Sequence, residues 1–127
     1  MKLAIWTSFA VLAALAAPAQ AQDAEAGKKV FNRCKACHDI EQPKNKIGPH
    51  LDGVIGRKAG SLPDFAYSDA MKKAGEDGLV WDDAKIAEYM TNPKGSIPGN
   101  KMAFAGLKKP EDVANLIAYL KTFPAKQ

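Results

Sequence analysis

Cys34-Lys35-Ala36-Cys37-His38 is the stretch of sequence that decides the fold. Two cysteines separated by two residues and followed at once by a histidine form the C-x-x-C-H pattern that attaches a c-type haem. One helical turn would present both thiols to the two vinyl groups of the porphyrin, and the adjacent imidazole would reach the iron. The pattern therefore predicts Cys34 and Cys37 as thioether donors and His38 as the proximal axial ligand.

Three other uses of the two cysteines compete with this prediction. A thioredoxin-like redox pair would follow a strand in a βαβ pattern, but no β-branched run precedes Cys34. A zinc site would need both cysteines, His38 and the distant His50, and adjacent cysteine and histidine residues are poorly placed to share one tetrahedral ion. A structural disulfide would close a very short loop and remove little entropy from the unfolded chain. Haem attachment is therefore the favoured interpretation.

The N-terminal segment has the pattern of a secretory signal. A positive start at Met1-Lys2, an apolar run over residues 3–17 and Ala19-Gln20-Ala21 together predict a cleaved signal peptide over residues 1–21. An uncleaved membrane anchor is the alternative, but the run is shorter than the roughly 18 to 20 residues that cross a bilayer. The remaining residues 22–127 are the right length for one small domain.

Helical signals lie on both sides of the cysteine motif. Asp23 and Glu25 mark the start of a helix, and apolar residues follow at intervals of three and four up to Cys34. Near the C-terminus, Pro110 suits the first position of a helix, the next two residues are acidic, and Lys121 closes the apolar pattern. Both ends of the domain are therefore expected to be helical.

The middle of the chain predicts shorter helices and long loops. A short helix is expected at residues 68–74 and a longer one after Trp81, ending before Pro93, whereas no convincing strand is present. Segments 48–60 and 93–106 are rich in glycine and proline and too long for simple connections. We therefore expect an all-α fold of three to five helices with long loops around one covalently bound haem. Few large apolar residues are available to offset backbone entropy, so the haem-free chain should be poorly folded.

The residue on the other side of the iron decides between a carrier and a catalyst. The candidates are Met71, Met90, Met102 and His50. Met71 and Met90 lie in predicted helices, where a methionine usually fills the core. His50 follows His38 so closely that its loop should stay on the proximal side, where it would be a surface histidine. Met102 lies far along the chain in a non-helical segment and is favoured, although spacing alone leaves the other three open.

Several short motifs occur in a recognisable order. They are Cys34 to His38, Gly48-Pro49, Gly56-Arg57-Lys58, Tyr67-Ser68-Asp69-Ala70, Asn92-Pro93-Lys94, Ile97-Pro98-Gly99-Asn100-Lys101-Met102, Phe104-Ala105-Gly106 and Leu116-Ile117-Ala118-Tyr119-Leu120-Lys121. This order resembles the class I cytochromes c over essentially all of residues 22–127. Together with the export signal, it indicates their bacterial periplasmic branch, the cytochromes c2.

The resemblance implies a set of haem contacts. Met102 would be the distal iron ligand, and the Pro49 carbonyl would accept a hydrogen bond from the ring of His38. The family also implies that Arg57, Tyr67 and Trp81 donate hydrogen bonds to the haem propionates. Tyr89 would lie beside the Met102 sulfur. Where the terminal helices cross, Gly27 and Phe31 would pack against Leu116 and Tyr119. The sequence departs from the family at Asn100, where threonine is common, and at Met71, where asparagine is common. Both changes alter a hydrogen-bond donor near the ring.

The implied function is that of a soluble periplasmic one-electron carrier. With His38 and Met102 on the iron, no open position remains for a substrate, so the protein would not be an enzyme. Two alternatives stay open: a haem enzyme or gas sensor from which Met102 is absent, and an exported binding domain without haem. The family implies a membrane cytochrome bc complex as electron donor and a photosynthetic reaction centre or terminal oxidase as acceptor.

Partner docking is expected to be electrostatic. The formal net charge is +4, and basic residues occur in segments expected to surround the haem edge: Arg33, Lys46, Lys94, Lys101, Lys108 and Lys109. Such a face would steer the protein, as a monomer, onto acidic partners in short encounters. A solvated basic face without a partner is the alternative. No nucleic-acid recognition motif is present, so nucleic acid is not expected as a partner.

Overall fold

The computed structural model describes residues 22–126 and contains five helices in that range. They are α1 (Ala24–Phe31), α2 (Asp69–Glu76), α3 (Asp83–Thr91), α4 (Pro93–Ser96) and α5 (Pro110–Leu120). The predicted signal peptide over residues 1–21 lies outside the described residues. Within the described part, strand pairing is limited to one isolated antiparallel bridge between Lys58 and Val80. The all-α prediction is confirmed.

Side-chain caps explain where three of the helices begin. The Asp23 carboxylate accepts hydrogen bonds from the backbone N–H groups of the first turn of α1. Ser68 and Asp82 do the same for α2 and α3. The predicted starts are therefore correct, but α2 extends to Glu76, beyond the expected end at residue 74.

The short helix α4 was not expected, because residues 93–106 read as a loop. Asn92 caps it by accepting a hydrogen bond from the Gly95 N–H, and Pro93 occupies its first turn. An asparagine followed by a proline is a helix-start signal, but four residues are too few to show an apolar period. The rest of the segment is an extended loop, as predicted.

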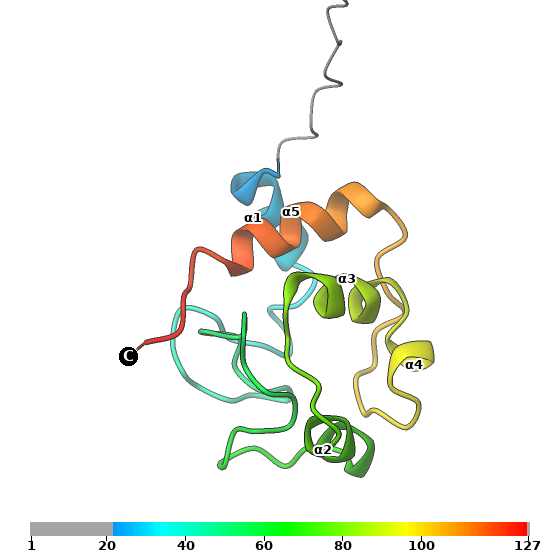
Figure 1. Ribbon diagram of the computed structural model, residues 1–127. Helices are drawn as coiled ribbons and strands as arrows, with labels where there is room; N and C mark the ends of the chain where they lie inside the picture. Colours follow the sequence, from blue (N-terminus) through cyan, green and yellow to red (C-terminus); the bar gives the residue numbers. More distant parts are fainter. Residues whose placement is uncertain (1–21, 127) are drawn as a thin grey trace, which may run out of the picture.

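The terminal helices α1 and α5 cross at one end of the molecule and contribute many of the residues of the core (Figure 1). Gly27 allows the crossing, because a Cβ atom at this position would collide with the backbone carbonyl of Asn115. Next to it, the ring centroids of Phe31 and Tyr119 are 5.4 Å apart. The predicted packing of Gly27 and Phe31 on α5 is therefore confirmed.

Among residues 22–126, no helix combines the length and apolar character needed to cross a membrane.

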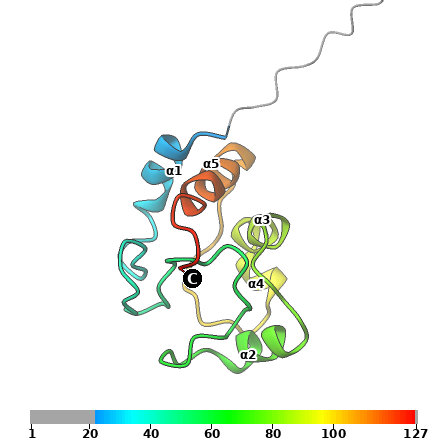
Figure 2. The same ribbon diagram turned by 60° about the vertical axis from the view of Figure 1, so that its left-hand side comes forward.

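The loops occupy the half of the molecule away from this crossing. In both ribbon views, α1 and α5 lie together at one end and α2 lies at the other (Figures 1 and 2). In Figure 1 the segment that follows α1 lies on the left and the segment that follows α4 lies on the right.

Candidate haem site

The cysteine motif continues the helical path of α1. The Cys34 N–H donates to the Phe31 carbonyl at 2.8 Å, and the N–H groups of Cys37 and His38 both donate to the Cys34 carbonyl, at 3.1 and 2.9 Å. This turn carries both thiols and the imidazole, as haem attachment requires. Both cysteines are free and half-buried.

The environment of the cysteines disfavours the competing interpretations. Burial raises the pKa of the Cys34 thiol, whereas a thioredoxin-like pair needs a thiol whose pKa is lowered. The disulfide alternative is not supported, because Cys34 and Cys37 are not bonded to each other. Among the described residues, no three His, Cys, Asp or Glu side chains are grouped as metal ligands. A zinc site at this motif therefore gains no support.

The His38 ring is fixed in the form that can bind a metal ion. Its Nδ1 lies 2.6 Å from the carbonyl oxygen of Pro49, and a carbonyl oxygen can only accept, so Nδ1 carries the proton. The lone pair is then on Nε2. Burial lowers the pKa of His38, despite the opposing effect of the Pro49 hydrogen bond, and this keeps the ring neutral near pH 7. The contact predicted between His38 and Pro49 is present.

Gly48 allows the loop that contains Gly48-Pro49 to lie against this ring. Its N–H donates to the Cys37 carbonyl at 2.7 Å. A Cβ atom at position 48 would collide with the imidazole of His38. The sequence motif Gly48-Pro49 thus supplies both the close approach and the acceptor that orients the ring, and only the second role was predicted.

Arg57 is a half-buried cation with an unpaired nitrogen. Its Nη2 donates to the carbonyl of His50 at 2.8 Å, whereas Nη1 is buried without a partner. Burial lowers the pKa of Arg57 and the Asp52 carboxylate is near enough to oppose this shift, but Nη1 still lacks the acceptor that a buried donor needs. A haem propionate would supply that acceptor, so this orphaned donor fits a haem in the site. The fit is a property of this structure and does not depend on the family resemblance.

The isolated bridge brings Arg57 next to Trp81. The Gly56 N–H donates to the Trp81 carbonyl at 2.8 Å, and the Trp81 N–H donates to the Arg57 carbonyl at 2.9 Å. Tyr67 lies on a neighbouring loop, where its hydroxyl oxygen accepts a hydrogen bond from the Leu62 N–H at 3.2 Å. This bond leaves the Tyr67 hydroxyl proton free to donate elsewhere.

His50 is not the surface residue that its position suggested. It is half-buried, and its Nδ1 is enclosed without a partner. Its backbone is held on both sides, because its N–H donates to the Asn45 side chain at 2.9 Å and its carbonyl accepts from Arg57. The side chain of Asn45 also reaches the carbonyl of Asp64 at 3.4 Å. This link between two loops gave no signal in the sequence.

The candidate distal residues lie against the core. Met71, Met90 and Met102 are all partly buried and contact it, so burial does not distinguish between them. Tyr89 is buried, with its ring centroid 5.1 Å from that of Trp81, and burial raises the pKa of Tyr89 to about 12. Met102 alone of the three lies on the extended loop after α4.

A helical turn with two free thiols, a neutral imidazole and a half-buried arginine defines a small helical c-type haem protein. Comparison with known proteins identifies the group within this class. The Cytochrome c family matches residues 24–124, and the chain therefore belongs to the class I cytochromes c, which are electron carriers and not enzymes. Its haem c is bound covalently through Cys34 and Cys37.

Individual relatives point to one branch of the family. The chain is 59% identical to cytochrome c2 of Afifella marina over 99 residues, which are 77% of this chain and 80% of the relative. It is 50% identical to cytochrome c2 of Blastochloris viridis over 116 residues, 91% of this chain and 89% of the relative. Among solved structures, cytochrome cH from Methylobacterium extorquens matches with a TM-score of 0.72 at 50% identity, covering 79% of this chain and 98% of that one.

Proposed function

We propose that this cytochrome carries single electrons in the bacterial periplasm with His38 and Met102 as the two axial ligands of its haem iron. The observation that carries the proposal is the hydrogen bond from His38 Nδ1 to the Pro49 carbonyl. It leaves Nε2 available to the iron from the same turn that holds Cys34 and Cys37. When bound, haem supplies an iron that takes up and releases one electron.

The protein's own residues would then limit the chemistry to electron transfer. His38 and Met102 would fill both axial positions, so no position remains for oxygen or a substrate. The thioether is a soft ligand that favours the reduced iron and raises the reduction potential. Arg57, Tyr67 and Trp81 would offset the charge of the propionates with hydrogen bonds, and Tyr89 would lie beside the Met102 sulfur.

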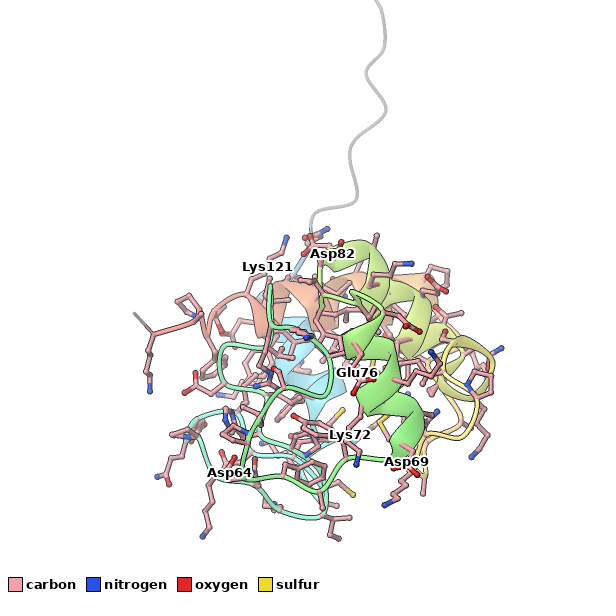
Figure 3. The ribbon with its side chains drawn as sticks, turned by 60° about the horizontal axis from the view of Figure 1, so that its bottom comes forward. Asp64, Asp69, Lys72, Glu76, Asp82 and Lys121 are labelled. Carbon is pink, nitrogen blue, oxygen red and sulfur yellow. The ribbon has the colours of Figure 1, made fainter. Side chains whose placement is uncertain are left out.

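The proposed route takes electrons from a cytochrome bc complex to a photosynthetic reaction centre or a terminal oxidase, after cleavage of residues 1–21 on export. Charge supports docking through the face of Arg33, Lys46, Lys94, Lys101, Lys108 and Lys109. All six are exposed, and among the described residues none of them forms an ion pair. Some of the other lysines are paired, as Lys72 is with Asp69 on α2, a helix that also carries Glu76 (Figure 3). Others, such as Lys28 and Lys58, are not paired within the part of the chain that the structure describes.

Replacing Met102 tests the ligation. In the ferric wild-type protein we expect the near-infrared sulfur-to-iron charge-transfer band, and Met102→Ala should abolish it. Met71→Leu and Met90→Leu are matched controls that remove the other two candidate sulfurs and should keep the band. Loss of the band in either control, with its retention in Met102→Ala, would reassign the distal ligand. Tight carbon monoxide binding by the wild-type ferrous protein would instead indicate an open iron and refute the carrier assignment.

A further inference from the structure

The side chain of Asn100 makes three hydrogen bonds that the proposed function does not explain. Its Nδ2 donates to the carbonyls of Pro93 and Ile97, both at 2.9 Å. Its Oδ1 accepts from the backbone N–H of Met102, also at 2.9 Å. Both N–H donors of the amide are therefore used within the protein.

These bonds connect Met102 to a fixed part of the core. Pro93 begins α4 and is fully buried, and Ile97 follows the end of the same helix and is also buried. The Asn100 backbone N–H donates to Ile97 as well, at 3.1 Å. At Gly99 the chain adopts a φ of 88°, which turns the Asn100 side chain back toward the helix. The amide thus joins the first residue of α4 and the residue that follows its end to Met102, which carries the thioether.

A threonine could not replace all of these contacts. A hydroxyl group has one proton to donate, whereas the asparagine amide has two and also presents a separate acceptor oxygen. The asparagine at position 100 therefore fixes the backbone of the loop that follows α4 and carries Met102, which we call the distal loop.

We propose that Asn100 is a positioning residue that keeps the Met102 sulfur on the iron and so resists its replacement by external ligands. The inference rests on the proposed function, since it requires Met102 to be the distal ligand. An external ligand must displace the thioether, and each hydrogen bond that holds the loop in place adds to the free energy of that displacement. Loosening the loop should therefore raise the apparent affinity for the external ligand.

Imidazole titration of the ferric holoprotein measures this effect. With Asn100→Ala, we expect the apparent affinity for imidazole to rise by about tenfold or more, because three hydrogen bonds are lost. Asn100→Thr keeps one donor and one acceptor and should give a smaller rise, about threefold. If Asn100→Ala yields too little holoprotein, the imidazole affinity of Asn100→Thr alone tests the role of Asn100.

Asn92→Ala is the matched control, because Asn92 also supports α4 but bonds to Gly95 and not to the Met102 segment. We expect this variant to unfold more easily while binding imidazole as the wild type does. Equal imidazole affinities for the wild type and Asn100→Thr, or for Asn100→Ala and Asn92→Ala, would overturn the role of Asn100. Absence of the sulfur-to-iron band from the wild type would instead refute the proposed function.

Discussion

The buried hydroxyl of Tyr89 links stability to alkaline pH. Burial raises its pKa to about 12, whereas a tyrosine in the unfolded chain ionises near pH 10. Between these values the unfolded state loses a proton that the folded state keeps, so folding stability is intact below about pH 10 and falls as the pH rises through about 12. The steepest expected loss from this group is about 1.4 kcal/mol per pH unit.

Tyr89→Phe should remove this contribution. Denaturant unfolding of the holoprotein at a series of pH values measures it. We expect the wild type and Tyr89→Phe to show parallel stability up to about pH 10 and the variant to lose less stability above that pH. Curves that stay parallel up to pH 12 would mean that the hydroxyl ionises equally easily in both states.

Single residues differed in how far their roles could be predicted. The resemblance to the class I cytochromes c implied the contact between His38 and Pro49, and the structure contains it. Asn100 could only be recognised as unusual, since its three partners become apparent once α4 and the distal loop are folded together. His50 was predicted to be a surface residue because it follows His38 closely along the chain, and the contacts that enclose its Nδ1 come from the folded loops.

At the level of helices, Gly27 controls the contact between α1 and α5. In an isolated helix, replacing glycine with alanine stabilises by about 1 kcal/mol. Here the added Cβ would meet the Asn115 carbonyl and the Cβ of Tyr119, and the backbone of α5 can move aside only by disturbing the core. The destabilisation from the collision between the helices should therefore exceed the stabilisation from the higher helix propensity of alanine.

Gly27→Ala should lower the free energy of unfolding of the holoprotein by about 3 kcal/mol or more. Lys28→Ala, on the exposed side of the same helix, is the matched control and should change it by no more than about 0.5 kcal/mol. Chemical denaturation monitored by circular dichroism compares the two. A Gly27→Ala protein as stable as the wild type would show that the helices can separate without cost.

The helices themselves were largely predictable, for a local reason. The starts of α1, α2 and α3 each depend on a capping side chain that the sequence displays directly. The end of α2 was placed too early because Gly75 reads as a helix terminator, whereas it is buried in the helix where a Cβ would strike the Ala59 carbonyl. That contact with a distant loop is not visible in a local pattern.

At the scale of the whole molecule, some lysines lie beside a carboxylate and others do not. Lys72 and Lys85 each lie near a carboxylate on their own helix, with N–O distances of 3.4 and 3.3 Å. Lys94 and Lys101 are exposed on α4 and the distal loop and are not part of any ion pair within residues 22–126. Their positive charge is therefore available to an approaching partner.

Reversing charge on these two sets tests the docking face. Replacing Lys94 and Lys101 together with glutamate should slow electron transfer to an acidic redox protein by about tenfold at low ionic strength, where charges act over roughly 30 Å. The double variant Lys72→Glu and Lys85→Glu changes the net charge equally and should have a clearly smaller effect. Stopped-flow rates at increasing salt should converge for both variants, because screening removes the steering. Equal slowing by both variants would show that net charge alone, and no particular face, governs the encounter.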